Sequence, residues 1–129
     1  MLITTHQRMF SDAAVGVMLS GAFSVALSGR QAKDAKAVVK TAEAAAAMAE
    51  GHVKAIPFLA LVFDSARRRD TLARPADELD AIQRVLTKTL PIFGCYCAGE
   101  IGPTDTADAS PSVLSHGLDW HIVMVLLAR

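Results

Sequence analysis

Two apolar runs and several mixed segments divide the chain into predicted strands and helices. The runs Ile56–Phe63 and Ile122–Ala128 are almost wholly apolar, as expected for strands that are covered on both faces. Each run is far shorter than the roughly 20 apolar residues that a helix needs to cross a bilayer. Near the start, Val15–Leu19 and Ala22–Leu27 flank a Ser-Gly pair. Because glycine tolerates the positive φ of a tight turn, we expect a β-hairpin there.

A long helix is predicted over Gln31–Glu50, where alanine dominates and no proline or glycine interrupts. Ser28 or Gly29 precedes this segment and Gly51 follows it, at a position where glycine often ends a helix in the left-handed conformation. The apolar residues recur at steps of three and four, so one face of the helix is small and apolar. The residues on this face are Ala35, Val38, Val39, Ala42, Ala45, Ala46 and Ala49.

Polar residues separate the first apolar run from a second predicted helix. The segment Asp64–Asp70 is expected to be a loop or a short edge strand, because its charged residues follow the apolar run without a break. Pro75 then signals the start of a helix whose body is Asp77–Thr89. The face of this helix that we expect to be buried consists of Leu79, Ile82, Val85 and Leu86.

The last third of the chain predicts two more strands. Pro91–Ala98 is expected to be a strand, and the glycines and proline of Gly99–Pro103 predict a turn after it. Thr104–Ser115 has no apolar periodicity and is expected to be a mobile loop, whereas Leu118–Ala128 is expected to close the domain as a strand.

The element order ββαβ(β)αββ predicts an α+β fold in a single domain over residues 1–129. We expect a mixed sheet of about five or six strands, with two helices packed on one face. Because the other face of such a sheet is open, a homo-oligomer that buries this face is also predicted.

Composition narrows the classes of partner. The chain is 52% hydrophobic and 20% charged, and its 13 Lys and Arg residues balance 13 Asp and Glu residues. Without a net positive field, neither nucleic acid nor an anionic membrane is an expected partner. The basic cluster Arg67–Arg69 has no interleaved aromatic residues and is interpreted as a solvated loop. The first residues lack the apolar run of a secretory leader, so we expect a cytoplasmic protein.

Cysteine and histidine residues leave two interpretations open. Cys95 and Cys97 alternate along a predicted strand, so both thiols point to one face, either as small packed side chains or as a thiol or metal site. His116 and His121 are the histidines that such a site would recruit, and His116 near Asp119 also resembles a catalytic base with its orienting carboxylate. No nucleophile elbow or phosphate-binding glycine loop accompanies them. Neither a cofactor nor a resident metal is therefore expected.

The segment that follows the second predicted helix resembles a known family. It is similar to the closing signature of the FIST C-terminal domain, named for F-box and intracellular signal transduction proteins, in which the pattern is approximately Gly-Phe-Tyr-x-x-Gly-Glu-Ile. The residues that match are Gly94, Tyr96, Gly99, Glu100 and Ile101.

Upstream, Ala60–Arg68 resembles the strand of that family that ends in Phe-Ser-Cys-x-x-Arg. Phe63 and Arg68 match, and Ser65 stands where cysteine is common. The resemblance covers residues 14–127 and corresponds to the later part of the family's domain.

The resemblance implies a sensory domain that binds a small ligand, such as an amino acid, without catalysis. Arg68 and Glu100 follow predicted strands, and if those strands are neighbours they offer a cation for a ligand carboxylate and an anion for its amine. With Tyr96 and Cys97 they form the predicted ligand-binding set. The other interpretation of Arg68 and Glu100 is a pair with each other or with solvent.

An alternative hypothesis is an enzyme. The element order is also similar to that of chorismate mutase-like or deaminase-like oligomers, in which sites lie between subunits. In that case Arg68, Cys97 and Glu100 would contribute to an inter-subunit site.

Overall fold

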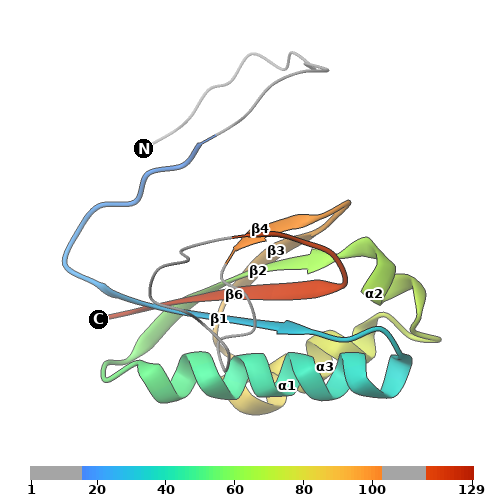
Figure 1. Ribbon diagram of the computed structural model, residues 1–129. Helices are drawn as coiled ribbons and strands as arrows, with labels where there is room; N and C mark the ends of the chain where they lie inside the picture. Colours follow the sequence, from blue (N-terminus) through green and yellow to red (C-terminus); the bar gives the residue numbers. More distant parts are fainter. Residues whose placement is uncertain (1–15, 103–115) are drawn as a thin grey trace, which may run out of the picture.

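The computed structural model describes residues 16–102 and 116–129. The elements follow the order β1 (Ser24–Gln31), α1 (Ala35–His52), β2 (Pro57–Ser65), α2 (Ala66–Asp70), α3 (Ala76–Leu86), β3 (Ile92–Cys97), β4 (Glu100–Gly102), β5 (His116–Leu118) and β6 (His121–Ala128). Figure 1 shows α1 and α3 side by side on one face of the main sheet, with the short α2 at the end of β2.

The main sheet is mixed, with strand order β1-β6-β2-β3. The C-terminal strand β6 lies in its middle, antiparallel to both β1 and β2, and β3 pairs parallel to β2 at the edge. A second, two-stranded sheet joins β4 and β5. The α+β class, the mixed sheet and its helices on one face are confirmed, and the short α2 adds a third helix.

Small side chains let α1 lie close to the sheet. Ala42, Ala45, Ala46 and Ala49 have no exposed surface and pack with residues of β1, β2 and β6 in one core cluster. Such contacts stabilise the fold by about 25 cal/mol for each Å² of apolar surface that they remove from water. The alanine face of the predicted helix is therefore confirmed, although Ala35 in the first turn is exposed.

The predicted ends of α1 were wrong. The helix begins after Asp34, whose side chain accepts a hydrogen bond from the Ala37 backbone N–H at 3.0 Å, as an N-cap does. Ser28, one of the residues predicted to precede the helix directly, lies in β1, where its hydroxyl donates to the Ala45 carbonyl at 2.7 Å. Gly51 lies inside the last turn and has no positive φ.

The predicted hairpin and the predicted segments around β2 and β3 need correction. Residues 16–20 form no strand, and β1 instead pairs with β6, because its apolar face is covered by α1 and its backbone by the C-terminal strand. The predicted loop after β2 is the helix α2, and the predicted turn after β3 contains the strand β4. The expected mobile loop Thr104–Ser115 lies outside the described residues.

The helix α3 ends three residues earlier than predicted. Thr87, with φ of 70°, leaves the helical conformation directly after Leu86. Ile82 and Leu86 are buried as expected, but Leu79 is 43% exposed. The prediction for Leu79 was wrong because this side chain lies beside a hollow between α3 and the edge strand β3 rather than in the core.

The open face of the main sheet carries exposed apolar side chains. On β1, Val25 and Leu27 are about half exposed, and on β3, Phe93 is 68% exposed. Assembly of copies through this face stays a prediction. Within the described ranges, no helix combines the length and the apolar character that a membrane span requires.

The contact between β3 and β2 depends on Gly94. A Cβ atom at this position would lie 2.0 Å from the Val62 carbonyl oxygen, far inside van der Waals contact with the neighbouring backbone. Any larger residue would have to push the edge strand away from β2.

We therefore expect Gly94→Ala to lower the free energy of unfolding by about 1–3 kcal/mol, as forced overpacking does. The matched control is Gly51→Ala, because nothing lies within 4 Å of the Cβ position at Gly51 and the change should be neutral or slightly stabilising. Urea denaturation of both variants measures the difference. Equal stabilities would contradict the close approach of β3 to β2.

Candidate functional site

The polar centre of the molecule forms where β2 runs directly into α2. Asp64, the penultimate residue of β2, points to the helix side of the sheet, like Val62 two residues before it. Because α2 begins without an intervening loop, Arg68 follows one helical turn later. The first turn of α3 then brings Glu78 against both residues.

Arg68 is completely buried and is held from three elements. Its Nε donates a hydrogen bond to Glu78 Oε1 at 3.1 Å and forms an ion pair with Asp64 Oδ1 at 2.9 Å. Its Nη2 also donates to Glu78 Oε1, at 2.5 Å. The guanidinium also donates to the Val38 carbonyl at 3.1 Å and to the Thr41 hydroxyl at 3.2 Å, both on α1. A buried cation with this many partners fixes the relative positions of β2, α1 and α3.

Two carboxyl groups contact the guanidinium, whose single positive charge can neutralise only one carboxylate. As carboxylates, Asp64 Oδ1 and Glu78 Oε2 accept no hydrogen bond from any described residue. Burial of Asp64, together with its hydrogen bond and charge repulsion with Glu78, raises the pKa of Asp64 to about 8. The cluster therefore holds one proton at neutral pH and is uncharged overall, in the way that paired buried carboxyls share a proton.

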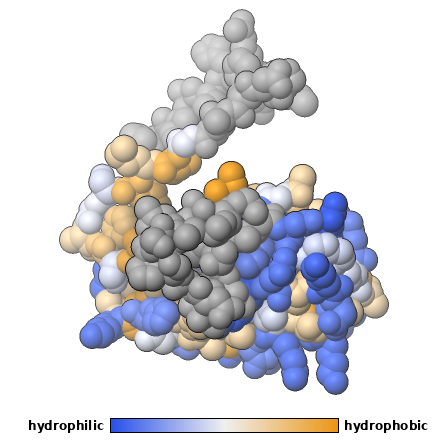
Figure 2. Space-filling view, viewed as in Figure 1, coloured by the Kyte–Doolittle hydropathy of each residue, from blue (hydrophilic) through white to orange (hydrophobic). Residues whose placement is uncertain are grey.

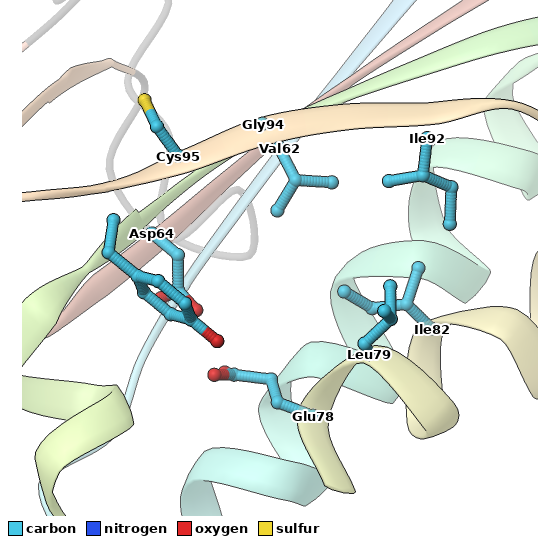
Figure 3. Close-up of a pocket in the computed structure, with 9 residues that line it drawn as sticks. Val62, Asp64, Glu78, Leu79, Ile82, Ile92, Gly94 and Cys95 are labelled. Carbon is cyan, nitrogen blue, oxygen red and sulfur yellow. The ribbon is translucent and has the colours of Figure 1, made fainter. Parts of the chain in front are cut away.

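A pocket of about 240 Å³ lies beside this cluster, between β3 and α3. Figure 3 shows Val62, Leu79, Ile82 and Ile92 around its apolar part, while Asp64 and Glu78 close its polar end. An apolar cavity with a few convergent polar groups is the usual form of a small-ligand site.

Tyr96 joins the pocket to the molecular surface. Its side chain lines the pocket and is 42% exposed. Partial burial and the nearby carboxyls of Asp64 and Glu78 raise its pKa above 10.0. The Arg69 guanidinium lies over the Tyr96 ring, 5.2 Å from its centre, and binds the exposed Asp70 at 2.8 Å.

The four residues of the predicted ligand-binding set lie in different surroundings. Tyr96 lines the pocket, and Arg68 lies behind its polar end, bound to Asp64 and Glu78. Cys97 belongs to the opposite face of β3, because alternate residues of a strand point to opposite sides. Glu100 is buried in β4, and that burial raises its pKa, while a hydrogen bond from the His121 backbone and, less strongly, the positive charge of Arg68 lower it.

Asp64, Glu78 and Arg69 were not predicted as site residues from the sequence. For Glu78 a signal was present, because it lies four residues before Ile82 and thus on the face of α3 that is buried. Asp64 likewise continues the alternate positions of Ala60 and Val62 on β2. A charged residue at a position that the apolar pattern buries is itself an indication of a polar site.

The basic cluster lies on α2 and is only partly solvated. Figure 2 shows hydrophilic residues gathered over the end of the molecule that carries α2. Arg67 is exposed there and pairs with Asp119 at 2.6 Å, whereas Arg68 in the same helix is buried. The interpretation of Arg67–Arg69 as a solvated loop was therefore wrong in its structure and for Arg68, since a helix turns successive side chains to different faces.

Metal ligands do not gather in the described part of the chain. In residues 16–102 and 116–129, no three His, Cys, Asp or Glu side chains come together as a metal ion requires. Cys95 and Cys97 are both free thiols, with 3.5 Å between their sulfur atoms.

Comparison with known proteins identifies one family. The model of the FIST C domain matches residues 9–103, about three quarters of the chain and a segment that includes Asp64, Arg68, Glu78 and Tyr96. The match begins somewhat before the resemblance seen in the sequence and ends before β5 and β6. No curated protein and no solved structure matches the chain.

The Arg68 cluster predicts a large difference between neighbouring arginines. Arg68→Met should lower the free energy of unfolding by about 3–5 kcal/mol, because it leaves two buried carboxyls without their cation. Arg67→Met, which removes an exposed pair with Asp119, should change it by about 1 kcal/mol or less. Urea denaturation at neutral pH measures both, and similar losses would contradict the buried cluster.

The proton on Asp64 predicts a pH dependence of stability. Folding raises the pKa of Asp64 from 3.8 to about 8, so its contribution to stability is complete below pH 3.8 and is lost as the pH rises to about 8. Asp64→Asn keeps the shape of the side chain, and its amide can donate a hydrogen bond to Glu78 without the proton that Asp64 must hold. As the pH rises through this window, the free energy of unfolding of Asp64→Asn should increase relative to that of wild type by up to about 1.4 kcal/mol for each pH unit.

Urea denaturation at several pH values between roughly 5 and 9 gives this difference. Asp80→Asn, on the exposed side of α3, is the matched control and should show no such trend. A constant difference between wild type and Asp64→Asn would mean that Asp64 is ionised throughout.

Proposed function

The chain belongs to the FIST C domain family, a family of sensory signal-transduction domains, and from this membership we propose that it binds a small amino-acid-like ligand without catalysing a reaction. The observation that carries the proposal is the buried carboxyl pair Asp64 and Glu78 at the end of an apolar pocket. A sensory domain needs such a site, in which a ligand changes contacts between structural elements.

The polar end of the pocket suits an ammonium group. When Asp64 is ionised, the two carboxylates outnumber the Arg68 guanidinium by one negative charge. A ligand amine would supply the missing positive charge and donate to the oxygens that accept no hydrogen bond as carboxylates. Binding of the amine would thus release the proton from Asp64, so affinity should rise with pH up to about 8.

The remainder of the pocket suits the other parts of an amino acid. Val62, Ile82 and Ile92 offer an apolar wall for a side chain of moderate size. Arg69, which stacks on Tyr96 at the edge of the pocket and is 40% exposed, would receive the carboxylate. In this arrangement Arg68 acts by holding Asp64 and Glu78 in place.

The Arg68 cluster also suggests how binding would be transmitted. Glu78 belongs to α3, and Arg68 links it to the Val38 and Thr41 groups on α1. A ligand that draws the Glu78 carboxylate toward the pocket would therefore shift the contacts of both helices. Such a change in the helical layer is the signal that a partner domain would read.

A thermal-shift screen tests the proposal. Apolar L-amino acids and the amines that lack their carboxylate should both raise the melting temperature, more at pH 9 than at pH 7, since ionisation of Asp64 favours the cation. A free ligand concentration of about 100 times its Kd would stabilise the protein by roughly 2.7 kcal/mol. No shift with any apolar amine or amino acid at either pH would refute the pocket as an amine site.

Three variants locate the ligand. Glu78→Gln should abolish the shift for amines and amino acids, whereas Arg69→Gln should remove only the advantage of the amino acid over its amine. Arg74→Gln, an exposed arginine that pairs with Asp77 and Asp80, is the matched control and should change neither.

Glu100→Gln distinguishes the binding site that was predicted from the sequence from the pocket between β3 and α3. If this variant, and not Glu78→Gln, abolishes binding, the ligand lies between Arg68 and Glu100, with Cys97 and Tyr96 beside it. That result would replace the pocket between β3 and α3 as the binding site.

A further inference from the structure

The side chains of the two cysteines lie on the face of β3 opposite to the pocket, although Cys95 is also one of the residues that line it. Cys95 is exposed, Cys97 is half-buried, and their sulfur atoms are 3.5 Å apart. Figure 3 shows Cys95 pointing away from the side of β3 on which Val62 and Ile92 enclose the pocket. Tyr96 lies between the cysteines in sequence and points to the pocket side. The sulfurs are thus close together while the residue between them belongs to the pocket.

We propose that Cys95 and Cys97 form a reversible disulfide bond that alters the pocket through Tyr96. The sulfurs need to approach each other by only about 1.5 Å to reach the S–S bond length of roughly 2.0 Å. The proposed bond is independent of the ligand assigned above, because it depends only on the two thiols and the backbone of β3.

Strand geometry makes such a bond labile rather than structural. Two residues of extended strand span about 6.6 Å, near the upper end of the Cα separations of roughly 4.4–6.8 Å that disulfides accept. Closing the bond must therefore shorten the strand locally. Strained or exposed disulfides are the readily reduced ones, which suits regulation and not permanent stabilisation.

Shortening the strand would act on Tyr96. When residues on one face of a strand are drawn together, the residue between them is pushed out on the other face. The strand β3 can respond because it lies at the edge of the main sheet and has β2 as its sheet neighbour. The displacement would move Tyr96 toward Asp64 and Glu78 and change its contact with Arg69.

The oxidant is a low-molecular-weight disulfide such as oxidised glutathione. The thiolate of the exposed Cys95 attacks one sulfur of this disulfide, which forms a mixed disulfide and releases the first small thiol. Cys97 then gives its proton to water, its sulfur attacks Cys95 Sγ, and the second small thiolate leaves and takes up a proton. The protein loses two protons and two electrons, which is the mass of two hydrogen atoms, and the small disulfide is reduced to two thiols.

The order of these steps follows from the surroundings of the thiols. Burial and the hydrogen bond with Cys95 raise the pKa of Cys97 to about 11, so Cys97 is protonated at neutral pH. Cys95 is the more accessible sulfur for the first attack. Cys97 is then already in position to resolve the mixed disulfide.

Intact-protein mass spectrometry tests the reaction. Reduced protein is equilibrated in glutathione buffers from reducing to oxidising, quenched with an alkylating reagent and weighed. Wild type should lose the mass of two hydrogens, take up no alkyl group and recover fully with dithiothreitol. Cys97→Ser should stop at a single glutathione adduct on Cys95, and circular dichroism checks that this variant is folded.

A permanent glutathione adduct on wild type, or a disulfide between two molecules, would overturn the internal bond. Cys95→Ser provides a second variant and should react much more slowly than Cys97→Ser, because its remaining thiol is half-buried. Equal rates for the two variants would overturn the assignment of Cys95 as the attacking thiol.

The single tyrosine of the chain reports on the pocket. Because Tyr96 has no other tyrosine to mask it, absorbance of its phenolate can be titrated in the reduced and the oxidised protein. We expect its pKa, already above 10.0, to rise further on oxidation as the ring approaches the two carboxylates. An unchanged titration would overturn the link between the disulfide and the pocket.

Discussion

Burial of the Arg68 guanidinium is the constraint on which the arrangement of the pocket depends. A buried cation requires nearby anions and acceptors, because its loss of hydration is not otherwise offset. Asp64, Glu78, Val38 and Thr41 provide them from β2, α3 and α1. The same requirement brings two carboxyls together, so one of them holds a proton. The chemistry of the pocket thus follows from how the fold accommodates one arginine.

The edge strand β3 carries pocket residues on one face and the two cysteine side chains on the other. Gly94 allows it to approach β2 closely, and Tyr96 extends from it toward the helices. Cys95 and Cys97 occupy the opposite face, away from the helices α1 and α3 that cover the main sheet in the described residues. An edge strand has fewer hydrogen bonds to break than a central one, so a change on one face can reach the other. Ligand binding and thiol oxidation would meet at this strand.

The segment that matches the family does not contain every strand of the main sheet. The matched residues 9–103 contain β1, β2 and β3 together with all the groups of the pocket. The central strand β6 lies beyond the match, yet it pairs with both β1 and β2. The sheet that supports the pocket is therefore completed by the C-terminal residues, and the matched segment does not build it by itself.

The amino-acid sequence is sufficient to predict the α+β class, the alanine face of α1 and the approximate positions of β2, α3 and β3. These features depend on local periodicity, which short-range side-chain geometry imposes on any fold. It also predicted Arg68 and Tyr96 as polar residues of interest. It did not predict that β1 pairs with β6, since pairing across about a hundred residues depends on the whole core rather than on a turn signal such as the Ser-Gly pair.

The role of Arg68, in contrast, follows from the packing of the helices on the sheet. Its partners are as close in the chain as Asp64 and as distant as Val38, and a sequence pattern does not encode which distant carboxyl will reach a buried guanidinium. Whether a charged residue faces solvent, a ligand or another charge depends on which elements pack together. The free energy of removing that charge from water then selects the partners that can offset it.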